Sequence, residues 1–153
     1  LIYNNYMVAK RWKRSSTAVY NVSYHIIWCT KYRRKLLVDD IASRLKELLA
    51  EKAAELGIEI KTMEVMPEHV HLFIKASPAD APQFLIGQLK GYSSRLLNEE
   101  FPALRTKLPS LWTRSYYCES VGRLSEGAVK RYIESQKSAS QENKERIKRA
   151  FFS

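Results

Sequence analysis

Two histidines and, further along the chain, a tyrosine and a glutamine are the residues whose types and spacing could do chemistry. His69 and His71 stand on either side of Val70 in the stretch MPEHVHLFIKA. Residues two apart in a β-strand point to the same face, so both imidazoles would project together, with a spacing suited to two ligands of one divalent metal. An isolated His-x-His is more often a surface or hydrogen-bonded pair, because so short a motif recurs by chance.

A metal site needs further ligands, and the last helical pattern of the chain offers a candidate pair. Tyr132 and Gln136, in AVKRYIESQK, are four residues apart, which places them on one face of a helix. Gln136 offers a neutral oxygen to a hard cation, and Tyr132 offers a phenol beside it. The alternative for Tyr132 is that it packs with Val129 and Ile133 and holds the helix to a sheet.

A metal bound at a phosphodiester would change what a phenol can do. A free phenol has a pKa of about 10 and is a poor nucleophile near neutral pH. A cation withdraws charge from phosphorus, stabilises the developing negative charge and fixes the line of attack. The His pair and the tyrosine therefore predict an enzyme that breaks a phosphodiester through a covalent phosphotyrosine.

The elements that must position these residues follow from the hydrophobic pattern. Residues 19–30 are rich in β-branched and aromatic side chains and predict a strand, and the stretches on either side of Pro67 predict a hairpin. A helix is expected from Asp39 or Asp40, either of which could cap it, to Gly57, and a second one after Pro78. We further expect a loop between prolines 102 and 109, a strand over residues 111–121, and a last helix from residue 125.

The order strand, helix, strand, strand, helix, strand and an extra helix is typical of the α+β class. It is the ferredoxin-like split βαβ arrangement, an antiparallel sheet with two helices on one face. Val70, Leu72 and Ile74 should face the helices, while His69 and His71 should project from the free face. We expect one domain over residues 1–153, with 1–18 as a mobile basic arm and 125–152 as the C-terminal helix that carries the tyrosine.

Composition limits the partners and the location of the protein. The chain of 153 residues has 26 Lys and Arg against 16 Asp and Glu, a net charge of +10, which favours a polyanion such as nucleic acid. Cys29 and Cys118 are too few and too far apart for a disulfide framework, which indicates the reducing cytoplasm. No segment approaches the roughly eighteen apolar residues of a membrane span, so we expect a soluble protein with no membrane partner.

The run KYRRK that follows the first strand is the main candidate for contacts with nucleic acid. Tyr32 could stack on an unpaired base while its basic neighbours hold phosphates. The alternative is a solvated charged face. The candidate DNA-binding residues are Lys31, Tyr32, Arg33, Arg34 and Lys35, with Lys90, Arg95 and Arg114 as weaker candidates.

Three further titratable residues lie on or beside the predicted strands, and we assign none of them to the site. His25 lies on the first strand with no partner that the sequence identifies, which favours a core or hydrogen-bonded role. Glu64 and Glu68 flank the hairpin, and we interpret both as solvated charges rather than ligands.

Five blocks of the chain, in order, resemble the single-tyrosine HUH transposases of small bacterial and archaeal insertion sequences. The blocks are YHIIWCTKYRRKLL, MPEHVHLFI, QLKGYSSRLL, LWTRSYYCESVG and VKRYIESQ, from about Tyr20 to Gln136. The resemblance implies that His69 and His71 are the metal ligands, that Gln136 is the third ligand, and that Tyr132 is the nucleophile.

The same resemblance implies a substrate, a cofactor and an assembly. It implies a ferredoxin-like homodimer that uses Mg²⁺ or Mn²⁺ and cuts single-stranded DNA at hairpin-bearing element ends, joining the tyrosine to a 5′ phosphate. An attack by another 3′ hydroxyl would then reseal the strand. The aromatic-rich stretch LWTRSYYCESV also favours a homodimer if it lies at a sheet edge. The alternatives are a non-catalytic module that binds single-stranded nucleic acid, or a domesticated relative that processes repeats.

Overall fold

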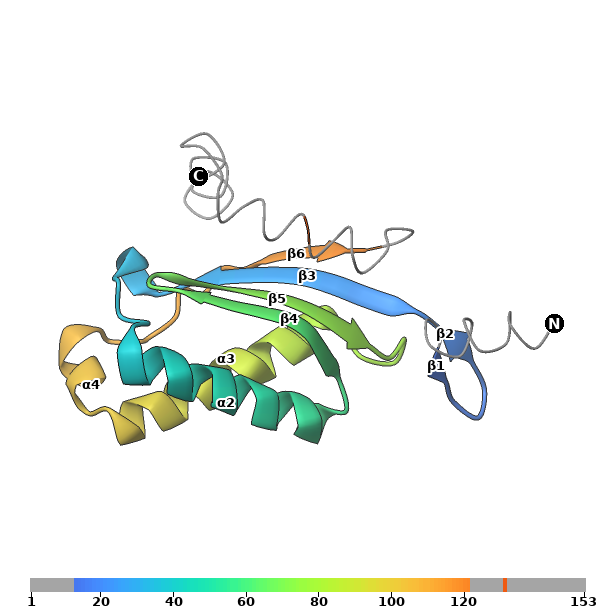
Figure 1. Ribbon diagram of the computed structural model, residues 1–153, viewed down its shortest axis with the longest axis horizontal. Helices are drawn as coiled ribbons and strands as arrows, with labels where there is room; N and C mark the ends of the chain where they lie inside the picture. Colours follow the sequence, from blue (N-terminus) through green and yellow to red (C-terminus); the bar gives the residue numbers. More distant parts are fainter. Residues whose placement is uncertain (1–12, 122–130, 132–153) are drawn as a thin grey trace.

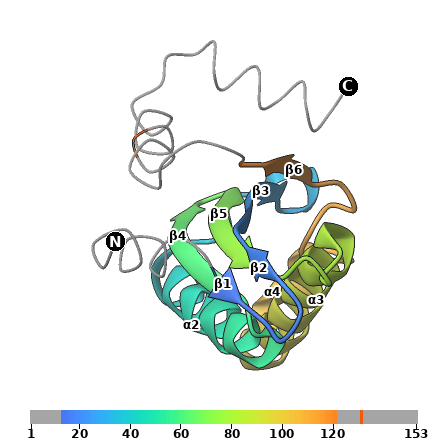
Figure 2. The same ribbon diagram turned by 90° about the vertical axis from the view of Figure 1, so that its right-hand side faces the viewer.

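The computed structural model describes residues 13–121 and Arg131, and residues 13–121 fold into a sheet with two long helices on one face (Figure 1). The four-stranded sheet is antiparallel and has the order β4-β5-β3-β6. A view along the sheet shows both helices on the same side of it (Figure 2). The strands are β1 (Lys13–Arg14), β2 (Val19–Tyr20), β3 (Val22–Cys29), β4 (Glu59–Met66), β5 (His69–Ala76) and β6 (Tyr117–Ser120), and the helices are η1 (Lys31–Arg33), α2 (Asp39–Leu56), α3 (Pro82–Glu100) and α4 (Ala103–Lys107).

This order confirms the predicted α+β fold for the described residues. The hairpin β4-β5 turns at Pro67 and Glu68, as the proline indicated, and α2 ends where Gly57 takes the left-handed φ of 71° that glycine adopts without strain. The predicted last helix over residues 125–152 lies outside the described residues, apart from Arg131, which is helical.

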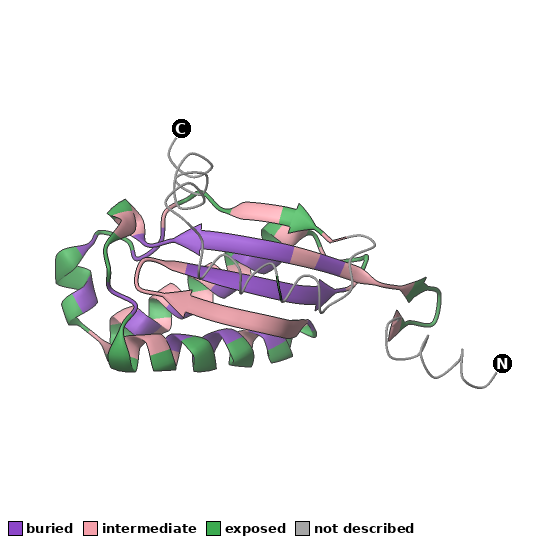
Figure 3. Cartoon of the chain, turned by 45° about the horizontal axis from the view of Figure 1, so that its top comes forward, coloured by how far each residue is buried: buried purple, intermediate pink, exposed green. Residues whose placement is uncertain are grey.

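The hydrophobic core fills the space between the sheet and the two helices. Val70, Leu72 and Ile74 of β5 are fully buried there, together with Ile26 and Trp28 of β3. Leucines of α2 and α3 complete the cluster from the other side. Burial colouring shows that the two central strands β3 and β5 are the most buried part of the sheet (Figure 3). The central position of β5 therefore holds His69 and His71 in a rigid frame.

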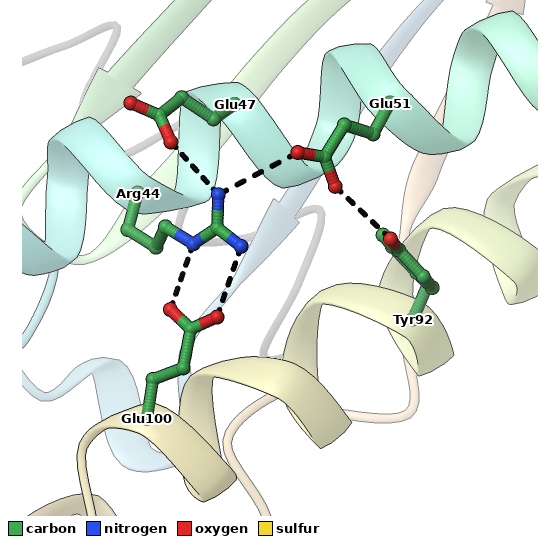
Figure 4. A network of polar contacts seen from close by, with 5 residues as sticks. All are labelled: Arg44, Glu47, Glu51, Tyr92 and Glu100. Carbon is green, nitrogen blue, oxygen red and sulfur yellow. Dashed lines mark hydrogen bonds and ion pairs between the residues drawn. The ribbon is translucent and has the colours of Figure 1, made fainter.

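The solvent side of the helical layer carries an ion-pair network that joins α2 to α3. Arg44 of α2 meets Glu100 of α3 with two parallel bonds, from Nε at 2.7 Å and from Nη2 at 2.9 Å (Figure 4). Its Nη1 also contacts Glu47 and Glu51, and Tyr92 of α3 donates to Glu51 at 3.0 Å. A bidentate pair fixes the relative position of the two helices more firmly than a single ion pair does.

The structure corrects the sequence prediction for residues 102–121. The expected loop contains the short helix α4, and the expected strand over residues 111–121 is reduced to β6. Ahead of β6, Lys90 Nζ donates to the carbonyls of Thr113, Arg114 and Ser115, so these groups are bound to a side chain rather than to a strand. Trp112 is buried and its ring lies 5.8 Å from that of Trp28.

Two smaller predictions at the starts of elements also need correction. The sequence assigned residues 1–18 to a basic arm, but Lys13 and Arg14 form β1, which pairs with β2, and Lys13 Nζ lies 3.4 Å from Glu59. Asp39 and Asp40 do not cap α2: both lie in its first turn, where their charges suit the positive end of the helix dipole, and Val38 is the capping residue.

No helix among the described residues has the length and apolar character that crossing a bilayer requires.

Candidate functional site

The two histidines of the His-x-His motif lie side by side on β5. Alternation along the strand puts Val70 and Leu72 against the helices, and His69 and His71 therefore project from the opposite face. Their ring centroids are 4.7 Å apart, with 54° between the ring planes. The spacing that the sequence predicted for this pair is thus present in the structure.

The surroundings of both rings favour the neutral form, which is the form that binds a metal. Burial, with smaller contributions from His69 and His25, lowers the pKa of His71 to about 3. Burial also lowers the pKa of His69, although Glu68 opposes this. His71 Nδ1 is buried and has no hydrogen-bond partner among residues 13–121. A buried polar atom normally has a partner, so this nitrogen fits a site that holds a further group.

Glu68 holds the ring of His69. Its Oε1 lies 2.9 Å from His69 Nδ1 and 3.7 Å from Nη2 of Arg33. The main chain of Glu68 is held as well, because its carbonyl accepts from Thr30 N at 2.9 Å. An ionised carboxylate only accepts hydrogen bonds, so His69 donates from Nδ1 and keeps its lone pair on Nε2. The expectation that Glu68 is a solvated charge is therefore wrong.

A third histidine lies on the same face, and the sequence gave it no partner. His25 of β3 pairs with Phe73, and its ring centroid lies 5.8 Å from that of His71 and 6.0 Å from that of Tyr117. Burial lowers the pKa of His25. His25 is buried, as the expected core role requires, but its ring lies next to His71 of the candidate site. The sequence could not predict this neighbourhood, because it depends on the pairing of β3 with β5, and strand order is not a local property of sequence.

Glu64 completes the surroundings of His71 from the strand on the other side. It lies directly opposite His71 in the β4-β5 register and is half-buried. Glu64 is thus less exposed than the interpretation as a solvated charge assumed. Residues paired across an antiparallel ladder point to the same face, so Glu64 shares the face of the His pair.

The described residues supply two metal-ligand candidates and not a full set. Among them, no group of three or more His, Cys, Asp or Glu side chains could hold a metal ion. If this pair binds a metal, a further ligand would have to come from outside the described residues, and Gln136 is the residue that the sequence offers. Gln136 and Tyr132 both lie outside the described residues.

The basic run forms a tight turn at the end of β3, next to the His pair. Tyr32 and Arg33 have φ values of 57° and 51°, a left-handed conformation that side chains other than those of Gly, Asn and Asp seldom adopt. Tyr32 is 68% exposed, and Arg34 and Lys35 also lie at the surface. Arg33 instead turns inward to Glu68, so it belongs to the histidine site as much as to the surface.

Comparison with known proteins places this arrangement in a family. The family model described as "Transposase IS200 like" matches residues 18–136. The ISDra2 transposase TnpA of Deinococcus radiodurans is 42% identical over 126 residues, which cover 81% of this chain and 90% of that protein. The transposase for insertion sequence element IS200 of Salmonella typhimurium is 29% identical over 119 residues, which cover 76% of this chain and 78% of that protein.

Two solved structures have a similar fold. The crystal structure of a putative transposase from Deinococcus radiodurans R1 matches with a TM-score of 0.68 and 38% identity, covering 81% of this chain and 97% of that one. A REP-associated tyrosine transposase bound to a REP hairpin matches with a TM-score of 0.54, covering 80% of this chain and 67% of that one; at 14% identity this likeness supports the fold alone. The family model, the identical residues and the fold agree, and the chain belongs to the IS200-like transposase family.

Proposed function

We propose that this transposase cuts and rejoins single-stranded DNA through a covalent bond between Tyr132 and a 5′ phosphate. We propose further that His69, His71 and Gln136 hold the divalent cation, Mg²⁺ or Mn²⁺, that this reaction uses. The observation that supports the proposal best is the pair of adjacent imidazoles on β5, that of His71 buried and that of His69 partly buried, with His71 Nδ1 lacking a partner among the described residues.

A bound cation would reduce the negative charge on the scissile phosphate and stabilise the charge that develops there. The phenol oxygen of Tyr132 attacks phosphorus, and its proton passes to water. The bond from phosphorus to the 3′ oxygen breaks, and that oxygen takes up a proton and leaves as a 3′ hydroxyl. In the rejoining step another 3′ hydroxyl attacks the phosphotyrosine and releases the phenol. The phosphotyrosine conserves the bond energy, so no nucleotide cofactor is needed.

The basic turn over residues 31–35 would hold the DNA strand beside the His pair. Lys31, Arg34 and Lys35 carry the charge that attracts phosphates, and the exposed ring of Tyr32 offers a surface on which an unpaired base can stack. One structure of similar fold is a transposase bound to a hairpin. We extend that substrate to this chain and propose that hairpin-bearing element ends are what it binds.

Removal of metal should stop cleavage. We expect EDTA to abolish cutting of a labelled single-stranded DNA that carries a hairpin, and Mg²⁺ or Mn²⁺ to restore it, because the His pair would then lose and regain its ion. His69→Ala should also lose cleavage while still binding the hairpin, as measured by gel shift. Full cutting in metal-free buffer would contradict the proposal, and duplex DNA of the same sequence should be a poor substrate.

Removal of one hydroxyl should abolish the covalent intermediate. Tyr132→Phe keeps the ring, so folding and hairpin binding should be unchanged, whereas the adduct that resists denaturing electrophoresis should fall to background. Tyr116→Phe is the matched control, because Tyr116 is exposed and lies just ahead of β6, and its adduct yield should equal that of the wild type. A normal yield from Tyr132→Phe would transfer the role of nucleophile to Tyr116 or Tyr117.

Glu68 should act as a positioning residue through His69. Carboxylates that hold a metal-binding histidine typically contribute 10- to 100-fold to metal affinity. We expect Glu68→Ala to weaken Mn²⁺ binding by about this factor in a calorimetric titration without DNA, and ¹⁵N NMR to show that His69 loses its preference for a proton on Nδ1. Glu59→Ala is the control: it removes a carboxylate from β4 that pairs with Lys13 and Lys61 instead. Equal Mn²⁺ affinity in the two variants would rule out this role.

We also propose that the protein is a homodimer. The sheet order puts β6 at an edge, and β6 begins with the aromatic residue Tyr117. An aromatic-bearing edge strand favours pairing with a second copy. Light scattering should therefore give twice the mass of one chain at micromolar concentration, and the mass of a single chain, with and without DNA, would refute the dimer.

A further inference from the structure

A groove lined by basic side chains lies between the turn that ends β3, helix α3 and the segment that leads to β6. Its volume is about 420 Å³, and it is lined by Lys31, by Lys90, Gly91 and Ser94 of α3, and by residues 109–114. Lys31, Lys90 and Arg114 give this lining three cations, and none of the described lining residues is acidic. The lining therefore favours an anionic ligand.

One wall of the groove is fixed by hydrogen bonds. Lys90 Nζ donates to the carbonyl of Thr113 at 2.6 Å and to those of Ser115 and Arg114 at 3.3 and 3.4 Å. Trp112 Nε1 donates to the Lys90 carbonyl at 3.1 Å, and Lys31 N donates to the Leu111 carbonyl at 2.7 Å. These bonds hold the segment before β6 in one conformation, so the groove is present before any ligand arrives.

The three cations differ in what they can offer a ligand. Lys90 already directs its ammonium at carbonyl groups, so it contributes charge rather than a free donor. Lys31 is half-buried and Arg114 is exposed, and neither has a carboxylate partner among residues 13–121. Lys31 and Arg114 are therefore the two side chains that can meet an incoming anion.

The groove begins where the His pair ends. Cys29 pairs with His69 across the sheet, Thr30 then bonds to the Glu68 carbonyl, and Thr30 also forms a bridge with Trp112 in the groove wall. In Figure 1 the segment between α4 and β6 runs past this same end of the sheet. A single DNA strand that leaves the His pair at its His69 end would therefore meet the groove next.

We propose that this groove binds a phosphate and its nucleotide of the single DNA strand that extends from the His69 and His71 site, with Lys31 and Arg114 as the phosphate contacts. The inference rests on the proposed function for the identity of the strand. A hollow of this volume accommodates one nucleotide of an unpaired strand, whereas a duplex would touch only its rim.

The test is the salt dependence of binding to fluorescein-labelled oligo(dT), measured by anisotropy at several salt concentrations. Each phosphate contact to a single strand contributes about −0.7 to the slope of log Kobs against log salt. Lys31→Ala and Arg114→Ala should each make the slope shallower by about 0.7, and the double variant by about 1.4. Lys46→Ala removes an exposed lysine from α2, away from the groove, and should leave the slope unchanged.

Three results would overturn the groove as a single-strand site. Unchanged slopes in both groove variants would do so, and if metal-dependent cleavage persisted the proposed function would stand. An equal change in Lys46→Ala would show that only the overall positive charge matters. A loss of binding to a blunt hairpin stem with normal binding to oligo(dT) would assign the groove to duplex DNA. If Tyr132→Phe cleaved normally but the slopes changed as expected, the groove would stand and the tyrosine mechanism would fail.

Discussion

The burial of β5 on both of its faces is the constraint on which the rest of the site depends. The strand has hydrogen-bonded neighbours on both edges, β3 and β4, and its alternating residues are packed on one side against the helices and on the other around the His pair. A slip of one residue would put His69 and His71 into the hydrophobic core and expose Val70 and Leu72, at a cost of several buried side chains. The register that buries the core is therefore the register that presents the two imidazoles.

The same constraint explains why some parts of the site could be predicted from sequence and others could not. The positions of His69 and His71 follow from a period of two along one strand, which is a local property. The place of His25 depends on which strand lies beside β5, and that is decided by the whole fold. The role of Glu68 depends on the turn that brings Thr30 and Arg33 to it, so a glutamate that is solvated on most surfaces is here held between a cation and a ring.

The shortening of the last strand has the same kind of cause. The alternation of LWTRSYYCESV fits a strand, but Lys90 of α3 takes the carbonyls of residues 113–115 and Trp112 enters the core. A lysine that caps three carbonyls cannot be recognised from the sequence around residue 113, because it comes from a helix 23 residues earlier. Hydrogen bonds from the Lys90 side chain to the main chain thus replace strand pairing in residues 113–115. The strand is shorter as a result, but the segment before it is held in a fixed position beside the turn that follows β3.

The distribution of charge differs between the helical layer and the end of the sheet. On the helical layer, Arg44 is surrounded by Glu47, Glu51 and Glu100, so its charge is more than balanced there. At the end of the sheet, Glu68 is engaged by Arg33 and His69, while Arg34 and Lys35 remain at the surface. This distribution of charge therefore favours the turn after β3 over the Arg44 cluster as the place where a polyanion would bind. Because that turn adjoins the His69 end of β5, the positive charge that would attract the DNA strand in the proposed reaction lies next to the imidazoles.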